Sequence, residues 1–118
     1  MKAVLIDEFG AAEVMKVGET AKPQPKANEV LIKTVATSIN RPDLVQRMGN
    51  YPAPAGDSEI LGLEVAGTIA EVGSDVSNWT VGDRVMALVG GGGYAEYAVA
   101  YENHLMPIPE TMSYEEAA

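Results

Sequence analysis

Asn40, Asp43 and Tyr51 are the residues whose types and spacing are best suited to chemistry. They supply an amide donor, a carboxylate and a phenol within a short stretch of chain, beside a position where a helix is expected to begin. Such a set can hold a polar ligand. It also has an ordinary structural interpretation, in which Asn40 and Asp43 cap a turn and Tyr51 packs in the core. Spacing alone favours the structural interpretation.

The segment Glu29–Ile39 must deliver the chain to Asn40, and it has the β-branched composition of a long strand. Both of its faces carry apolar residues, which suits a sheet that curls into a barrel. Pro42 then fixes its own φ and disfavours a helical conformation at the residue before it. We therefore expect a short helix with Arg41 as its N-cap and Pro42 as its first residue. Asp43 falls in the first turn, where exposed amides favour a carboxylate.

Short strands separated by glycine-rich turns account for most of the remaining chain. The expected strands are Met1–Ile6, Val14–Thr20, Glu64–Val72, a strand that leaves the turn at Val81–Val85 and runs through Leu88, and Tyr94–Tyr101. Trp79 is expected to anchor the loop before that turn in the core. The pattern predicts a small, mostly β barrel.

The composition excludes several classes of function. A chain of 118 residues is long enough for one domain, and it contains neither a membrane-spanning apolar run nor the start of a signal peptide. It has no cysteine, which excludes disulfides and thiolate metal sites. With 17 acidic and 8 basic residues, the net charge of −9 repels nucleic-acid phosphates and anionic lipid. We expect a cytoplasmic protein without nucleic-acid or membrane partners.

For two further motifs we prefer a structural interpretation to a functional one. Gly90–Ala95 fits the letters of a G-x-G-x-x-A nucleotide loop, but Tyr94–Tyr101 has the period of a strand where that loop requires a helix. We therefore expect Gly90–Gly93 to be a flexible hairpin connection. His104 is the only histidine, and without cysteine it lacks the partners that a catalytic zinc needs, so we expect a surface or hydrogen-bonded histidine.

The end of the sequence carries a helix-start signal. Ser113 and Glu116 have the spacing of a capping box, and two alanines follow. A single turn is far below the roughly 12 residues that an isolated helix needs. We expect residues 1–112 to form one domain and residues 113–118 to begin a helix that leads toward a nucleotide-binding domain missing from this fragment.

Several motifs together resemble the medium-chain dehydrogenase/reductase superfamily. They are Gly62-Leu63-Glu64-Val65-Ala66-Gly67, Glu71-Val72-Gly73 with Val76, Val81-Gly82-Asp83-Arg84-Val85, and Gly93-Tyr94-Ala95-Glu96-Tyr97. The resemblance covers nearly the whole chain and implies the N-terminal catalytic domain, which is a GroES-like, partly open β-barrel with one or two short helices. The Rossmann domain of such enzymes lies outside the sequence.

The resemblance is greatest to the zinc-free quinone oxidoreductases of the p53-inducible type and to the zeta-crystallin relatives. Zinc alcohol dehydrogenases have cysteine where this chain has Asn40 and histidine where it has Leu63. Residues 85–93 are too short to hold the structural zinc lobe. The resemblance therefore implies a cytoplasmic oxidoreductase that transfers hydride from NADPH to a quinone without a metal, with NADPH bound mainly by the missing domain. It also implies a homo-oligomer in the full-length enzyme and an inactive isolated fragment.

The same resemblance assigns roles to individual residues. Asn40 and Asp43 match positions at the nicotinamide and substrate cleft, and Tyr51 matches a tyrosine of the quinone pocket. Leu63 implies an apolar wall of that pocket, whereas the role of Glu64 stays open. Hydride addition builds negative charge on the quinone oxygen, and an amide or phenol donor is worth up to roughly 3 kcal/mol there.

Two alternatives remain. A zinc-free enoyl reductase of the same superfamily would reduce a conjugated thioester in place of a quinone. A stand-alone GroES-like binding module would need a mobile partner loop, and neither residues 78–81 nor residues 90–93 have an apolar tripeptide within a long polar loop.

Overall fold

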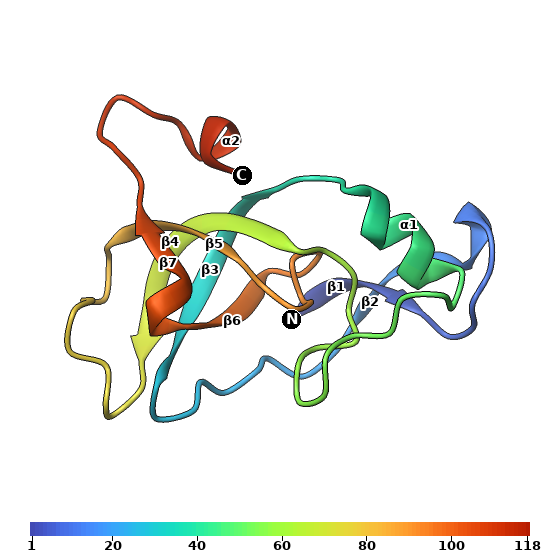
Figure 1. The fold of residues 1–118 in the computed structure, drawn as a ribbon, viewed down its shortest axis with the longest axis horizontal. Coiled ribbons are helices and arrows are strands. Elements are labelled where there is room, and N and C mark those ends of the chain that lie inside the picture. Colours follow the sequence, from blue (N-terminus) through green and yellow to red (C-terminus); the bar gives the residue numbers. More distant parts are fainter.

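A computed structural model describes all residues from Met1 to Ala118. The strands are β1 (Lys2–Ile6), β2 (Met15–Glu19), β3 (Glu29–Thr37), β4 (Glu64–Val72), β5 (Arg84–Leu88), β6 (Tyr97–Tyr101) and β7 (Leu105–Pro107). The helices are α1 (Arg41–Arg47) and α2 (Tyr114–Ala117), with 3-10 turns at Ala12–Val14 and Glu102–His104. β1 and β2 form a separate pair, and the other strands form one antiparallel sheet in the order β6-β3-β4-β5-β7 (Figure 1).

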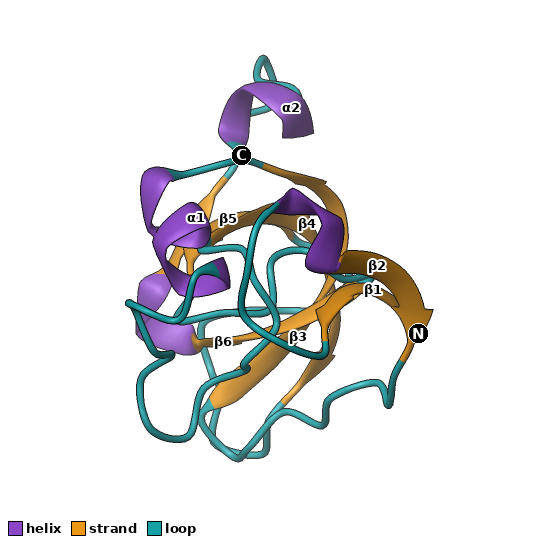
Figure 2. Ribbon diagram, turned by 90° about the vertical axis from the view of Figure 1, so that its right-hand side faces the viewer, coloured by secondary structure: helices purple, strands orange, loops and turns teal.

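The sheet curls around its own core. Val30, Leu31 and Ile32 are consecutive in β3 and all three are fully buried, so both faces of this strand are covered. Viewed along the long axis, the strands wrap around the interior (Figure 2). β6 and β7 are the two end strands and do not pair, which leaves the barrel partly open. The prediction of a mostly β, partly open barrel with short helices is confirmed.

One apolar cluster fills this barrel. Its members are Val30, Ile32, Val65, Ile69, Val85, Ala87, Ala98, Ala100 and Leu105. Trp79 packs against the cluster, and its indole Nε1 donates to the carbonyl oxygen of Glu102 at 3.0 Å. Because the hydrogen bond satisfies the polar end of the ring, Trp79 anchors the loop before β5 as the sequence predicts.

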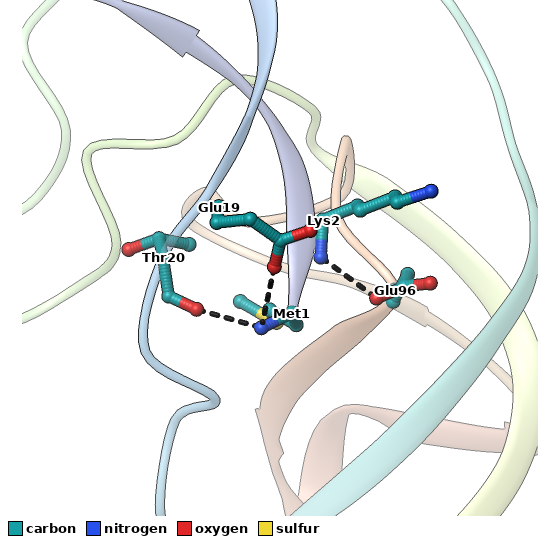
Figure 3. Close-up of polar contacts among 5 residues, drawn as sticks. All are labelled: Met1, Lys2, Glu19, Thr20 and Glu96. Carbon is teal, nitrogen blue, oxygen red and sulfur yellow. Dashed lines mark hydrogen bonds and ion pairs between the residues drawn. The ribbon is translucent and has the colours of Figure 1, made fainter.

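The β1–β2 pair is held at its start by polar contacts. The ammonium group of Met1 donates to the carbonyl oxygen of Thr20 at 2.7 Å and lies 3.5 Å from the carboxylate of Glu19 (Figure 3). The backbone nitrogen of Lys2 donates to the carboxylate of Glu96 at 2.7 Å. The Met1 contacts join the two strands of the pair, and the Lys2 bond attaches the pair to the segment that precedes β6.

That attachment shortens the last long strand. The sequence predicts a strand over Tyr94–Tyr101, but β6 begins at Tyr97. Upstream of it, the Tyr94 carbonyl accepts from the Val4 nitrogen at 2.8 Å and Ala95 forms a bridge with Ala3. The backbone of residues 94–96 pairs with β1, and it meets the main sheet only where the Glu96 carbonyl accepts from the Thr34 nitrogen at 2.9 Å.

The prediction that Gly90–Gly93 joins a hairpin is wrong. β5 and β6 are separated in the sheet by β3 and β4, so the glycine run crosses between distant strands. It packs on the segment before β4, where the Gly92 nitrogen donates to the Ile60 carbonyl at 2.7 Å. A Cβ on Gly91 would lie 2.0 Å from the Ser58 carbonyl oxygen, so only glycine allows this approach. No helix follows the run, as its strand-like continuation indicates.

The helix start at the end of the chain is confirmed. The Glu116 nitrogen donates to the Ser113 hydroxyl at 3.1 Å, and the Ser113 nitrogen donates to the Glu116 carboxylate at 2.9 Å. The Arg84 guanidinium lies 4.6 Å from the ring centre of Tyr114 and donates to the Met112 carbonyl at 2.7 Å. None of the helices has the length and apolar character needed to cross a membrane.

Candidate functional site

The candidate site lies where β3 ends and α1 begins. Asn40 has the extended backbone of an N-cap and Arg41 is the first helical residue, so the prediction of Arg41 as N-cap is wrong by one position. The reason is that Asp43 stands three residues after Asn40, where its carboxylate accepts from the Asn40 backbone nitrogen at 2.8 Å. Pro42 occupies the second helical position, where a missing N–H costs nothing.

Asp43 is buried and linked to a distant tyrosine. Its side chain is only 2% exposed, and its Oδ2 atom accepts from the Tyr94 hydroxyl at 2.7 Å as well as from Asn40. The other carboxylate oxygen, Oδ1, is buried without a partner. Burial and the neighbouring carboxylate raise the pKa of Tyr94 well above its ordinary value, so the phenol stays protonated and keeps donating.

The Asn40 side chain points away from α1, toward the start of β4. Its Nδ2 atom donates to the carboxylate of Glu64 at 2.7 Å and lies 3.3 Å from the hydroxyl of Ser38. The Ser38 hydroxyl donates to the same Glu64 oxygen, and the Thr37 hydroxyl donates to the Glu64 carbonyl at 2.6 Å. We call Ser38, Asn40 and Glu64 the amide anchor.

The charge of Glu64 determines how the amide is oriented. Hydrogen bonds from Ser38 and Asn40 lower the pKa of Glu64, against a smaller opposing effect of burial. An ionised carboxylate only accepts, so the atom of Asn40 that faces it must be the NH₂ group. One N–H of that group is committed to Glu64, whereas the other has only the long contact to Ser38. The amide anchor therefore holds a donor in place that a ligand can engage.

We expect Glu64 to make folding more sensitive to acid. Because its pKa is lower in the folded chain than its ordinary value of 4.5, the unfolded chain takes up the proton first. The stabilisation is present above about pH 4.5 and is lost as the pH falls through the folded-state pKa. When the pH is lowered from 7 to 3, the urea midpoint of Glu64→Gln should fall less steeply than that of the unsubstituted parent chain. The exposed Glu13→Gln is the matched control, and equal slopes in Glu64→Gln and the parent would contradict this assignment.

Tyr51 lies apart from the amide anchor. It follows α1 in a loop and is 44% exposed, so the interpretation of Tyr51 as a core residue is wrong. It lines a cavity of about 420 Å³ together with Gln46, and no hydrogen bond joins it to Asn40 or Asp43. Leu63 directly precedes Glu64 and is half-buried. The structure thus brings Asn40 and Asp43 together and leaves Tyr51 on the neighbouring loop.

Sequence reasoning missed two members of this network. Ser38 and Tyr94 were not among the candidate residues, although the structure bonds them to Glu64 and Asp43. Tyr94 stands far from Asp43 in the chain and no spacing rule connects them. Ser38 lies beside Glu64 because it directly follows Thr37, which pairs with Val65 of β4.

The structure holds no cluster suited to a metal ion. No group of three or more histidine, cysteine, aspartate or glutamate side chains comes together. His104 is exposed and its ring meets that of Tyr101 edge to face at 5.4 Å. It lies on the surface, as the sequence predicts.

Comparison with known proteins places the chain in a family. The family described as "Alcohol dehydrogenase GroES-like domain" matches residues 26–110. A quinone oxidoreductase of Rattus norvegicus is 37% identical over all of this chain, which spans 36% of that relative. The quinone oxidoreductase of Coxiella burnetii superposes with a TM-score of 0.91 at 33% identity, over 100% of this chain and 40% of that one.

A third comparison concerns a cofactor complex. The structure of Escherichia coli quinone oxidoreductase complexed with NADPH superposes with a TM-score of 0.90 at 30% identity, over 99% of this chain and 36% of that one. The chain thus spans little more than a third of the length of the relatives that it matches. On the family match and the shared fold, the chain belongs to the alcohol dehydrogenase GroES-like domain family of the medium-chain dehydrogenase/reductase superfamily.

Proposed function

We propose that this chain is the substrate domain of a longer, NADPH-dependent quinone oxidoreductase that works without zinc. The observation that carries the proposal is the amide anchor. At the position where zinc enzymes of the superfamily place a cysteine ligand, this chain has Asn40, held by Glu64 and Ser38. The network offers a hydrogen-bond donor where those enzymes offer a metal. The similarity to quinone oxidoreductases supports the quinone as acceptor.

In this proposal Asn40 and Tyr51 contact the acceptor and the other residues position them. The second N–H of Asn40 exchanges its long contact with Ser38 for the quinone oxygen as negative charge develops there, and the bond to Glu64 fixes the direction of that donor. The exposed Tyr51 phenol supplies a second donor from the loop after α1. Leu63 contributes an apolar wall beside the ring. Asp43 is too buried to touch a ligand, so it acts by holding the Asn40 backbone and Tyr94.

The residues present fit only the nicotinamide side of the cofactor. NADPH supplies the hydride when it is bound. Asn40 lies at the family position for this side of the cleft, and the neighbouring Asp43 supports it. The glycine run at 90–93 does not open a helix, so its amides do not form a pyrophosphate site. We propose that the phosphates are bound by a second domain.

Calorimetric titration tests whether NADPH binding needs a second domain. We expect the 118-residue chain to show no measurable NADPH binding and no quinone reduction, whereas a protein that carries the chain together with a nucleotide-binding domain does both. Positioning of donor and acceptor is worth as much as roughly 7 to 11 kcal/mol, and the isolated chain cannot supply it. Micromolar NADPH binding by the isolated chain would contradict the proposal. A 2-enoyl thioester is tested beside the quinone, and faster NADPH oxidation with the thioester would favour the enoyl reductase alternative. If neither acceptor supports NADPH oxidation, a binding module is favoured.

We also expect activity to be independent of zinc. Asn40 and Leu63 replace two metal ligands of the zinc enzymes, and no other ligand cluster is present. Elemental analysis of purified protein should find zinc far below one atom per chain, and a chelator should leave quinone reduction unchanged. Stoichiometric zinc, or a loss of activity that added zinc restores, would refute this.

A further inference from the structure

A second feature of the domain is an acidic cavity behind the loop that carries Tyr51. It has a volume of about 420 Å³ and lies between the turn after β1, the end of α1 and the loop of residues 49–59. Its lining includes no basic residue and four acidic residues: Asp7, Glu8, Asp57 and Glu59. Only one of the four has an ion pair, since Lys16 lies 3.9 Å from Asp7 on the exposed surface.

The nearest arginine does not neutralise the cavity. The Arg47 Nε atom donates to the Gly10 carbonyl at 3.1 Å and does not line the space. Glu8 and Glu59 therefore retain uncompensated negative charge at this cavity, whereas a carboxylate oxygen of Asp57 lies beside Gly90, outside the lining. Such an arrangement attracts a cation.

Gln46 independently indicates that a hydrogen-bond donor is missing from this cavity. Its side chain is 5% exposed and lines the cavity wall. Its Nε2 atom donates to the Glu59 carbonyl at 3.3 Å, whereas its Oε1 atom is buried with no partner. A buried acceptor without a donor costs about 1 to 3 kcal/mol, so a ligand that brings an N–H group would be favoured.

The remaining walls indicate what kind of cation fits. Phe9 and Tyr51 present exposed aromatic rings, and Pro52 and Pro54 add apolar surface. Aromatic faces attract an ammonium group and also pack against an apolar body. A bare metal ion is a poorer match, because the carboxylates do not gather into a group that could coordinate one.

We propose that this cavity binds a small organic ammonium ion with an aromatic or alkyl body. The ammonium N–H groups face the Gln46 Oε1 atom and the carboxylates of Glu8 and Glu59, and the body lies against Phe9 and Tyr51. This site shares Tyr51 with the proposed acceptor contact, but it needs no cofactor, so binding to the isolated chain tests it separately from hydride transfer.

The test is a titration of the 118-residue chain followed by ¹H–¹⁵N NMR, with benzylammonium as the probe at pH 7 and physiological salt. We expect saturable shifts confined to the Gln46 side-chain amide and the backbone of residues 7–9 and 49–59. Benzyl alcohol has the same body without charge and should bind at least about tenfold more weakly, and benzoate should not bind.

Variants then assign the site. The double variant Glu8→Gln/Glu59→Gln should raise the dissociation constant about tenfold, whereas Glu115→Gln on the distant α2 should leave it unchanged. Gln46→Met keeps the size of the side chain and removes the acceptor, so it should also weaken binding. Equal affinity for benzyl alcohol, or shifts spread over the whole acidic surface and unchanged in the double variant, would overturn the proposal.

Discussion

Replacing Asn40 with alanine in the proposed quinone oxidoreductase should lower kcat/KM for the quinone about 10 to 1000-fold. The substitution removes the amide that, in the proposal, donates to the acceptor and whose direction the bond to Glu64 fixes. It leaves the start of α1 intact, because the bonds there use the Asn40 backbone: its nitrogen donates to Asp43 and its carbonyl accepts from the Asp43 nitrogen. The loss should therefore appear in steady-state kinetics while circular dichroism and the urea midpoint stay close to those of the parent.

Matched variants separate a catalytic role from a structural one. Asn50→Ala removes an exposed amide just beyond α1 and should leave kcat/KM unchanged. Glu64→Ala releases the Asn40 amide without removing it, so it should lower kcat more than it raises KM, and Glu64→Gln should recover part of the loss because a glutamine oxygen still accepts. Parent-like kinetics in Asn40→Ala would return Asn40 to the role of a helix cap.

Tyr51→Phe is expected to lower kcat/KM within the same range. It removes only the phenol oxygen, so packing in the loop is preserved. The control is Tyr101→Phe, a partly exposed tyrosine on β6 outside the site. If both substitutions leave quinone reduction unchanged, the Tyr51 phenol does not contact the acceptor.

Gly67→Ala should destabilise the fold by about 3 to 5 kcal/mol, which approaches the whole stability of a small domain. Gly67 lies in β4 opposite Thr34 of β3, and a Cβ there would stand 2.1 Å from the Lys33 carbonyl oxygen. The clash is with backbone in the middle of the sheet, so no side-chain rotation relieves it. Urea denaturation followed by Trp79 fluorescence measures the loss.

Gly56→Ala is the control for this prediction. Gly56 has a φ of +92°, which alanine adopts reluctantly, but a Cβ there meets nothing within 4 Å. It should cost only about 1 to 2 kcal/mol. A cost for Gly67→Ala no larger than that of Gly56→Ala would show that the β3–β4 spacing adjusts to the methyl group.

The sequence was sufficient for most features that depend on neighbouring residues, with the N-cap of α1, predicted one residue late, as an exception. The bounds of β4 match the predicted Glu64–Val72, and the capping box at Ser113 forms as expected. Consecutive apolar residues in β3 indicated a strand covered on both faces, which is how a curled sheet buries them. The side-chain alternation of a strand and the hydrogen bonds of a helix cap involve residues within a few positions of each other, so the sequence alone reveals them. β7 escaped detection because three residues are too short to show a period.

Only the tertiary structure decided how these elements assemble into a site. It showed that the glycine run crosses between strands that are not neighbours in the sheet. Glycine content indicates a close backbone approach but does not indicate which strands the segment connects. It also bonded Asn40 to Glu64 and Asp43 to Tyr94. These partners stand far apart in the chain, and their contact depends on the register and curl of a sheet that no local pattern specifies. The sequence showed which side chains could do chemistry. The geometry by which the Glu64 carboxylate orients the Asn40 amide exists only in the folded domain.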